Sequence, residues 1–592
     1  MKKDVAGCHV LHHSFTVGGI RMHKQWWKEA VVYQIYPQSF QDSNGDGFGD
    51  LNGIITRLDY LKELGVDVLW LCPIFDSPMF DNGYDVKDYY GIMEKFGTLE
   101  DFERLLCRAH EKGLRVVLDA VFNHTSDQHP WFVESRRRDS KYRDYYVWAD
   151  PVDGHEPNNW MSIFGGSVWE HDSVSDAYYM HLFFKQQPDL NWENPAVRRE
   201  LRKILEFWCE KGVDGFRFDA INLFSKPEDM SDWPDPYRIG DYANGKHTHP
   251  YLQELLKGLD DKYNIMLVGQ TDNVRPEDAL LFAGFDRGEF QMIFQYELDN
   301  YRNNGPTFKW HTQVPSVLEI KEIFTKWQQV LADKAWNTVC LGSHDMPRSV
   351  SRYGNDQIFH KESAKMLATF QMSLQGTPFL YQGDELGMTN TVFDTVDDFL
   401  DDEARNFYHD FVDSGKISND EFMKAARFRA RDNARTPMQW DATENAGFTN
   451  GIPWMRVNPN YLTINAAAQM ADENSILSYY KQLLSIRKQH DVFVYGRYEL
   501  TDASNPAVYS FLRILEDEEL LVLCNFTAQE AKVAVPADFL KSGVSLLLGN
   551  YSTHPEPLKA EISIRPYEAR IYLRKKGIEK EETSVSKNGA SV

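Results

Sequence analysis

Polar residues stand at the ends of several short apolar runs. Asp219 directly follows the run 215–218, and Arg217, two positions earlier, lies on the same face of an extended strand. A cation beside a carboxylate favours the ionised form, which suits a nucleophile. His124 and the pair His344-Asp345 follow similar runs. A single Arg–Asp pair is a common structural contact, but several such ends gathered in one place indicate a ligand. Sugar chemistry needs this arrangement, with carboxylates as acid, base and nucleophile.

A second group of oxygen-bearing residues lies in the segment 42–50, which reads Asp-Ser-Asn-Gly-Asp-Gly-Phe-Gly-Asp. Oxygen side chains alternate with small residues, and glycine at the sixth position permits a sharp turn, as in the first nine positions of a calcium-binding loop. The glutamate at position twelve and the flanking helices of an EF-hand are missing. The pattern predicts several oxygens around one hard cation, and the alternative is a surface turn rich in Asp and Asn.

The strand-like runs alternate with longer helical stretches between about residue 30 and residue 390. Eight of them are found, at 31–35, 68–71, 115–119, 215–219, 265–269, 291–294, 338–341 and 378–381. Eight parallel strands with helical crossovers are typical of a (β/α)₈ barrel. Such barrels keep their chemistry at the carboxyl ends of the strands, where the polar residues above stand.

Three segments break this rhythm. Residues 125–188 are rich in Trp, Tyr, Asn and Gly, which predicts a small inserted domain after the third strand, and an irregular stretch follows the eighth strand. From residue 494 short alternating runs predict an antiparallel β domain. The expected division is therefore a flexible N-terminal extension (1–23), a catalytic barrel (24–124 and 189–493), the inserted domain (125–188), a C-terminal β domain (494–575) and a disordered tail (576–592).

Composition excludes several classes of protein. The 592 residues, 42% of them hydrophobic and 14% aromatic, fit a large globular chain of two or three domains. Acidic residues number 88 and basic residues 64, and a net charge of −24 repels phosphate backbones, so no nucleic acid partner is expected. No stretch approaches the roughly 20 apolar residues of a membrane span. The first 23 residues lack a continuous apolar core, so we expect no secretory signal and a cytoplasmic location.

The strand-end motifs resemble those of the α-amylase family of glycoside hydrolases, family 13. The matching segments are Asp-Ala-Val-Phe-Asn-His at 119–124, Gly-Phe-Arg-Phe-Asp at 215–219 and His344-Asp345. Gln-Pro-Asp-Leu-Asn at 187–191 resembles the signature of the oligo-1,6-glucosidase and α-glucosidase subfamily, and the segments 26–27, 32–37, 81–85 and 431–440 also fit. The resemblance covers roughly residues 25–575 and implies a (β/α)₈ barrel with an inserted small domain and a C-terminal antiparallel β domain.

The resemblance also implies roles for individual residues. The enzyme would be a retaining, exo-acting α-glucosidase on short α-glucosides, that is, malto- or isomalto-oligosaccharides or related disaccharides. Asp219 would be the nucleophile that carries the glucosyl group, and Asp345 would bind the 2- and 3-hydroxyls. The glucose subsite would comprise Asp81, Tyr84, His124, Arg217, His344 and Arg431, with Tyr84 under the ring and Asp81 and Arg431 at the 4-hydroxyl. A structural Ca²⁺ would be held by Asp42, Asn44, Asp46, the Phe48 carbonyl and Asp50. A monomer is expected.

One position departs from the family pattern. The general acid of the family is a glutamate after Val-Gly at the fifth strand, and this chain has Gln270 there. An amide cannot protonate a departing sugar oxygen or deprotonate the attacking water, and acid–base catalysis is worth about 10²–10⁴-fold. Gln is nearly isosteric with Glu, so we expect sugar binding to persist. Because the nucleophile and the sugar-binding positions are all present, we interpret this form as an inactivated Glu→Gln variant.

The sequence leaves the substrate and two other functions open. Ala220 follows the nucleophile where relatives that prefer α-1,6 bonds usually have Val, which leaves room for an α-1,4-linked aglycone. One alternative is a sucrose-active or transglycosylating relative, although the Arg-Leu-Asp-Arg-Asp loop of sucrose isomerases is absent and residues 296–300 read Tyr-Glu-Leu-Asp-Asn. The other alternative is a catalytically silent sugar-binding homologue.

Overall fold

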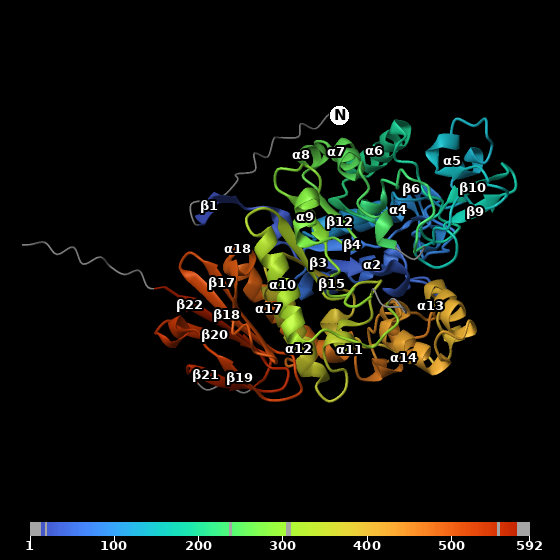
Figure 1. Cartoon of the computed structure of the whole chain (residues 1–592). Helices are drawn as coiled ribbons and strands as arrows, with labels where there is room; N and C mark the ends of the chain where they lie inside the picture. Colours follow the sequence, from blue (N-terminus) through green and yellow to red (C-terminus); the bar gives the residue numbers. More distant parts are fainter. Residues whose placement is uncertain (1–13, 18–19, 236–238, 304–308, 553–556, 577–592) are drawn as a thin grey trace, which may run out of the picture.

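The computed structural model describes residues 14–17, 20–235, 239–303, 309–552 and 557–576. Its centre is a closed barrel of parallel strands in the order β11-β12-β13-β14-β15-β3-β4-β7 (Figure 1). In chain order the strands are β3 (Val32–Ile35), β4 (Val68–Leu71), β7 (Arg115–Ala120), β11 (Gly215–Phe218), β12 (Met266–Gln270), β13 (Met292–Phe294), β14 (Trp336–Cys340) and β15 (Thr377–Tyr381). Each overlaps one of the eight predicted runs, and the predicted (β/α)₈ barrel is confirmed.

Aromatic rings fill the inside of the barrel. Trp70, Phe294 and Phe379 come from strands that are not neighbours, yet their ring centroids lie 5.5 Å (Trp70–Phe294), 6.2 Å (Trp70–Phe379) and 4.7 Å (Phe294–Phe379) apart. The indole N–H of Trp70 donates to Asp119 Oδ2 at 3.1 Å. The apolar core of the barrel therefore ends directly beneath the first polar residues of the strand ends.

Helices cover the outside of the barrel and explain why its strands are buried on both faces. In α4 (Leu99–Glu111), Thr98 and Asp101 form a capping box, and Phe102 and Leu105 lie on the buried face. The other main helices around the barrel are α2 (Leu51–Thr56), α3 (Leu58–Leu64), α6 (Pro195–Glu210), α7 (Thr248–Leu256), α9 (Pro276–Ala283), α10 (Val317–Leu331), α12 (His360–Ser373) and α17 (Ile476–Gln489). Helix α17 packs against α12 and α3, so the end of the barrel chain lies beside its beginning.

The inserted segment leaves and re-enters the barrel at one point, where His124 and Asp189 form an antiparallel bridge. It contains α5 (Pro130–Ser135) and a three-stranded sheet of β8 (Trp148–Ala149), β10 (Ala177–Met180) and β9 (Trp169–Asp172), in that order. A second insertion, with α13 (Asp402–Tyr408) and α14 (Asn419–Arg429), lies on the same side of the barrel (Figure 1). The two insertions touch, since the Asn406 amide donates to the Phe164 carbonyl at 3.2 Å.

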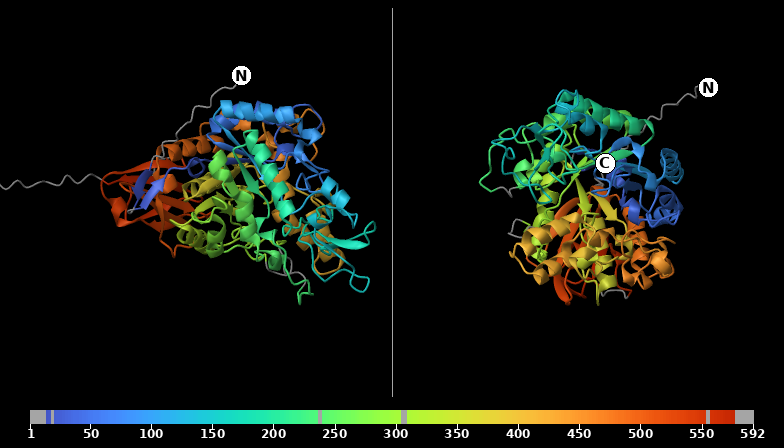
Figure 2. Two further views of the ribbon diagram at one scale, coloured as in Figure 1. Left: turned by 90° about the horizontal axis from the view of Figure 1, so that it is seen from above. Right: turned by 90° about the vertical axis from the view of Figure 1, so that its right-hand side faces the viewer.

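The C-terminal domain is an antiparallel sheet at the opposite end of the molecule from the insertions (Figure 2). Its strands are β16 (Arg497–Thr501), β17 (Val508–Leu515), β18 (Glu518–Asn525), β22 (Ala569–Lys575) and β20 (Val544–Gly549) in spatial order, with β19 (Ala531–Ala534) and β21 (Glu561–Ile564) as a separate pair. The larger sheet packs on α10 and α12 of the barrel. The predicted C-terminal antiparallel β domain is thus present.

Part of the predicted N-terminal extension has regular structure. The strands β1 (Ser14–Val17) and β2 (Ile20–His23) form an antiparallel hairpin. Residues 1–13 and 18–19, and the predicted disordered tail apart from Lys576, lie outside the described residues. Within the described part of the chain, no helix has both the length and the apolar character that a membrane crossing requires. The five cysteines described there are free thiols.

Candidate active site

Asp219 stands immediately after β11, and its backbone N–H donates to the Ala120 carbonyl of β7 at 3.1 Å. The fully buried Arg217 donates to Asp219 and to Asp119, both at 2.7 Å. Burial raises the pKa of Asp219, and Arg217 only partly opposes that rise. Arg217 therefore acts as expected from the sequence, but burial has the larger influence on this carboxyl. Ala220 adopts a left-handed conformation (φ +48°) and turns the chain away from the strand.

Tyr84 and His344 are stacked face to face, with ring centroids 5.2 Å apart and planes 1° from parallel. The Tyr84 hydroxyl donates to Asp119 Oδ2 at 3.0 Å, which ties this pair to the Arg217 network. The Gln34 amide donates to His344 Nδ1 at 2.7 Å, so the proton of the neutral ring is on Nε2, 3.2 Å from Asp345 Oδ2. Burial lowers the pKa of His344 to about 3, and the ring is therefore a neutral hydrogen-bond donor.

Asp345 is the most exposed of these carboxylates, with 32% of its side chain accessible. Arg431 lies 3.3 Å and Arg435 3.4 Å from its Oδ1. Burial acts to raise the pKa of Asp345, but His344, Arg431 and Arg435 outweigh it and hold that pKa well below the usual range. Asp345 is thus a permanently charged hydrogen-bond acceptor at neutral pH.

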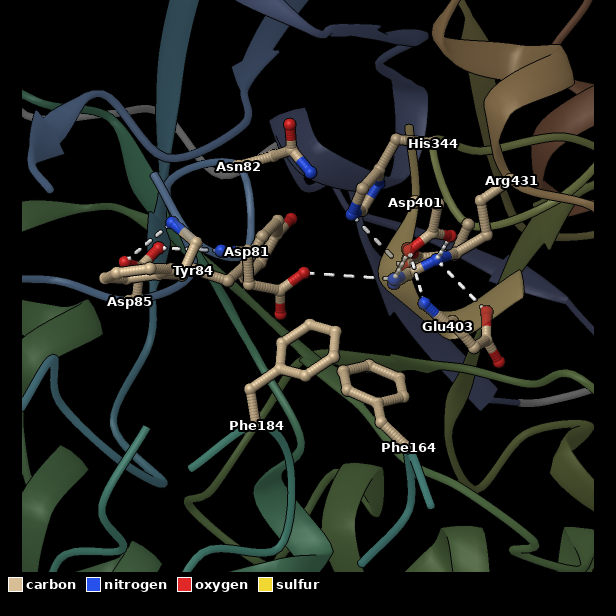
Figure 3. Close-up of polar contacts among 12 residues, drawn as sticks. Asp81, Asn82, Tyr84, Asp85, Phe164, Phe184, His344, Asp401, Glu403 and Arg431 are labelled. Carbon is tan, nitrogen blue, oxygen red and sulfur yellow. Dashed lines mark hydrogen bonds and ion pairs between the residues drawn. The ribbon is translucent and has the colours of Figure 1, made fainter. Parts of the chain in front are cut away.

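Arg431 is surrounded by carboxylates (Figure 3). Its Nε and Nη2 form a fork on Asp401 at 2.6 and 2.7 Å, and Glu403 lies 3.3 Å from Nε. Asp81 lies 3.8 Å away and faces Arg431 from the far side of the barrel mouth. The sequence did not single out Asp401 or Glu403, because they come from the irregular second insertion. The only local signal is that Asp401 caps α13.

The segment 187–191 connects the inserted domain to the site. The Gln187 amide donates to Asp81 Oδ2 at 3.0 Å and lies 3.1 Å from His124 Nε2. His124 Nε2 also donates to the Tyr84 carbonyl at 2.9 Å, and burial lowers the pKa of His124 to about 4. Asp189 is fully buried and lies 2.5 Å from Lys226 Nζ. The segment 187–191 thus holds the point where the insertion re-enters the barrel, and it also positions the loop that carries Asp81 and Tyr84.

Two rings of the inserted domain complete this side. Phe164 and Phe184 lie next to one another, with centroids 4.5 Å apart, and face the space between Asp81 and Arg431 (Figure 3). The Arg431 guanidinium lies 5.1 Å from the Phe164 ring. These apolar faces beside charged groups suit a ring-shaped ligand with hydroxyls at its edge.

Gln270 ends β12, next to the strand that precedes Asp219. Phe218 pairs with Gly269 in register, so Asp219 and Gln270 follow neighbouring positions of adjacent strands. A Cβ at Gly269 would lie 2.4 Å from Ile221 Cδ1, so a larger residue before Gln270 would require the Ile221 side chain to move. The Gln270 Oε1 is buried and has no hydrogen-bond partner among the described residues. Gln270 thus places an unpaired hydrogen-bond acceptor at the position where the resemblance to the α-amylase family implies a general acid.

The segment 42–50 winds around its own side-chain oxygens. The Asp42 carboxylate accepts backbone N–H bonds from Asn44, Gly45 and Gly47 at 2.8–2.9 Å. Asp50 caps α2 and accepts from Ser43. Asn44 and Asp46 are exposed and use one side-chain oxygen each for a backbone N–H two residues later. No cluster of three or more His, Cys, Asp or Glu side chains placed to hold a metal is found in the described ranges.

Comparison with known proteins agrees with this geometry. The sequence profile of the alpha amylase catalytic domain matches residues 34–496, and that of the maltogenic amylase C-terminal domain matches residues 498–571. The oligo-1,6-glucosidase of Parageobacillus thermoglucosidasius is 49% identical over 558 residues, which are 93% of this chain and 99% of the relative. The trehalose-6-phosphate hydrolase of Bacillus subtilis (strain 168) is 45% identical, over 92% of this chain and 98% of its own.

Solved structures point the same way. A Glu→Gln variant of isomaltulose synthase from Erwinia rhapontici NX5, in complex with its natural substrate sucrose, superimposes with a TM-score of 0.90 at 42% identity, over 93% of this chain and 99% of that one. Profiles that span most of the chain, together with relatives of this similarity, show that the chain belongs to the α-amylase family of glycoside hydrolases, family 13.

Proposed function

We propose that the protein is a retaining, exo-acting α-glucosidase that releases the non-reducing terminal glucose of short α-glucosides. The observation that carries this proposal is the position of Arg431, which lies between Asp81 and Asp345 beside the stacked rings of Tyr84 and His344. Crowded charged donors and acceptors suit the hydroxyls of one terminal sugar better than the passage of a longer chain.

The chemistry that we assign to Asp219 is a double displacement. One of its carboxylate oxygens forms a bond to C1 of the glucose while the C1–O bond to the aglycone breaks, and the electron pair goes to the departing oxygen. Water then forms the second bond to C1, and the electron pair returns to Asp219. Arg217 donates to Asp219 at 2.7 Å and orients it, and the charged Asp345 accepts from the 2- and 3-hydroxyls.

Gln270 limits this reaction in the present chain. The departing oxygen needs a proton and the attacking water must lose one, and an amide supplies neither step. We propose that this form binds sugar but turns it over at least about 10²-fold more slowly than a form with Glu at position 270. A Glu→Gln variant of a relative has been solved with its substrate sucrose, which supports intact binding.

The relatives favour particular substrates. Several of the curated relatives are oligo-1,6-glucosidases, which favours isomalto-oligosaccharides. Structural neighbours named as isomaltulose and trehalulose synthases favour sucrose as the second candidate substrate. Transglycosylation competes with hydrolysis once the glucosyl-enzyme has formed.

We also propose that the segment 42–50 binds a structural Ca²⁺. Its donor set of carboxylates, one amide and one carbonyl is the type that Ca²⁺ prefers. Asp46 is exposed and retains a carboxylate oxygen that the backbone does not use, which supports the proposal. The ligands would be Asp42, Asn44, Asp46, the Phe48 carbonyl and Asp50, and the ion would hold the loop after β3 in place.

The test is glucose release from maltose, isomaltose, sucrose, nigerose, kojibiose and trehalose-6-phosphate. The Gln270→Glu protein is compared with the chain as it stands, and Asp219→Asn in the Gln270→Glu background is the control for the nucleophile. We expect rapid release from one or two sugars by the Gln270→Glu protein, with α-glucose as the first anomer formed. No release from any sugar by either form would favour the silent sugar-binding homologue.

A further inference from the structure

Lys226 is a nearly buried lysine that the proposed mechanism does not use. It lies in the turn after the nucleophile Asp219, and 11% of its side chain is accessible. Its ammonium donates to Asn123 Oδ1 at 2.7 Å and to the Leu223 carbonyl at 2.8 Å, and it lies 2.5 Å from Asp189 Oδ2. An ammonium has three N–H groups and no acceptor, so these three contacts match its full donor capacity. Lys226 thus joins the turn after β11 to the segment after β7 and to the segment that re-enters the barrel.

The contact with Lys226 determines which way the Asn123 amide faces. Asn123 is fully buried, and because an ammonium only donates, the amide atom next to Lys226 must be the acceptor Oδ1. The Nδ2 group then faces Asp189 Oδ1 and His124 Nδ1, both at 3.2 Å. The Asp189 carboxylate presents acceptor oxygens, so it requires the same orientation of the amide. Asn123 therefore offers an N–H donor to His124.

The orientation of Asn123 selects one tautomer of His124. Since Nδ1 accepts from Asn123, the proton of the neutral ring is on Nε2. The other side of the ring agrees, because Nε2 lies 2.9 Å from the Tyr84 carbonyl, which only accepts. The Gln187 amide beside Nε2 donates instead to Asp81 Oδ2 at 3.0 Å and to the Tyr84 carbonyl at 3.3 Å. Burial lowers the pKa of His124 to about 4, so the ring is neutral.

We infer that Lys226 is a positioning residue of the proposed glucose subsite, and that through Asn123 it keeps His124 an Nε2–H donor there. A ring with its proton on Nδ1 would turn a lone pair toward the Tyr84 carbonyl, and two acceptors would face each other. The loop that carries Asp81 and Tyr84 would then lose a hydrogen bond, and the terminal sugar would lose a donor.

This inference rests on the proposed α-glucosidase function, and it deepens it by naming a residue outside the sugar contacts that sets the state of one of them. The loss of one donor weakens binding of the terminal glucose equally in the ground state and in the transition state. We therefore expect an effect on KM of about five- to tenfold, the worth of one hydrogen bond, with a change in kcat of less than about twofold.

The first experiment reads the tautomer by long-range ¹H–¹⁵N NMR correlation of the full chain with ¹⁵N-labelled histidine rings. His124→Gln identifies the signals of His124 among those of the 18 histidines. In the parent we expect an unprotonated Nδ1 and a protonated Nε2 at all pH values above about 5.5, since the ring is neutral there. Lys226→Met should add a second set of His124 signals with the proton on Nδ1. Lys203→Met, which removes a lysine from an exposed pair, is the matched control and should give the parent spectrum.

Asn123→Asp gives a second test that does not depend on the folding of Lys226→Met. It keeps the shape of the side chain and an acceptor for Lys226, but the new carboxylate has no N–H to offer His124. We expect Nδ1 of His124 to become protonated. In the Gln270→Glu background, Lys226→Met and Asn123→Asp should each raise KM for isomaltose and the inhibition constant of glucose about five- to tenfold, with kcat within about twofold. Lys203→Met should leave all three constants unchanged.

Three results would overturn the inference. They are a proton on Nδ1 of His124 in the parent, an unchanged His124 spectrum in Asn123→Asp or in folded Lys226→Met, and a changed tautomer that leaves KM and the inhibition constant of glucose as they were. A loss of kcat alone would indicate a merely structural role and would also count against it. The spectra need no turnover, and glucose release by the Gln270→Glu protein tests the proposed function separately, so failure of one proposal is distinguishable from failure of the other.

Discussion

Replacing Asp401 by Asn tests whether Arg431 grips the terminal glucose. Asp401 receives two charge-assisted hydrogen bonds from Arg431, at 2.6 and 2.7 Å, in the fork geometry that guanidinium and carboxylate share. Asn keeps one acceptor but presents its NH₂ group to the second N–H of Arg431. The change therefore removes one of the two bonds and the negative charge, while leaving the shape of the side chain and its acceptor for capping α13.

The magnitude follows from what Arg431 retains. Removal of one partner of a buried ion pair costs about 3–5 kcal/mol when the other charge is left alone. Arg431 still faces Asp345 at 3.3 Å, Glu403 at 3.3 Å and Asp81 at 3.8 Å, so a smaller value applies. A hydrogen bond to a charged group is worth about 1.5–3 kcal/mol. We take about 2 kcal/mol as the upper limit of the loss in binding free energy, which corresponds to a rise in KM of up to roughly 30-fold.

The assay is steady-state hydrolysis of isomaltose, with glucose as a competitive inhibitor, in the Gln270→Glu background. KM and the inhibition constant of glucose should rise together, with a smaller change in kcat, because binding to the terminal sugar is lost equally in ground and transition states. Although burial acts in the opposite direction, Arg431 depresses the pKa of Asp401. The contribution of the Asp401–Arg431 ion pair is therefore present above the unfolded-state pKa of Asp401, near 4. The effect of Asp401→Asn on KM should be equal at pH 5.5 and 7.5.

Asp402→Asn is the matched control, since Asp402 is exposed and its one ion pair within the described part of the chain is with Arg405, at 3.6 Å on the surface of the same helix. Its KM should stay within about twofold of the parent. If Asp401→Asn also leaves KM within that range, Arg431 does not need Asp401 to bind glucose, and the reasoning is wrong.

Three other changes test separate parts of the structure. Ala220→Val places two further methyl groups beside the nucleophile, and we expect the ratio of isomaltose to maltose turnover to rise; an unchanged ratio contradicts this. Removal of Ca²⁺ with a chelator should lower Tm, and Asp46→Asn, which keeps the turn but loses the charge, should make Tm indifferent to Ca²⁺; equal responses of both proteins would argue against the metal site. Lys226→Met leaves Asp189 buried without its cation and should lower the free energy of unfolding by about 3 kcal/mol, whereas Lys203→Met, at an exposed pair, should leave the thermal melt nearly unchanged.

The barrel was predictable because parallel strands buried on both faces appear in the sequence as continuous apolar runs. The predicted run 338–341 starts later than β14 (Trp336–Cys340) because Asn337 interrupts its apolar pattern. The positions of Asp219 and His344 were predictable for a different reason. The carboxyl ends of all strands of one barrel lie at the same face, regardless of the conformation of the connecting loops.

Residues outside strand ends could not be found in this way. Asp401 and Glu403 reach Arg431 from an irregular insertion, and only tertiary packing decides where such a segment lies.

The pairing of β3 with β15 has a consequence for biosynthesis. The first strand of the barrel, β3, pairs with the last, β15. Arg431, the ion-pair partner of Asp81, follows β15 in the chain. At about 5–20 residues per second, translation leaves the edge of β3 unpaired for roughly 20–70 s while the rest of the barrel is made. An unpaired apolar edge attracts other chains, so nascent chains that stall before β15 should aggregate rather than bind sugar. The sugar site is thus among the last features of this protein to form.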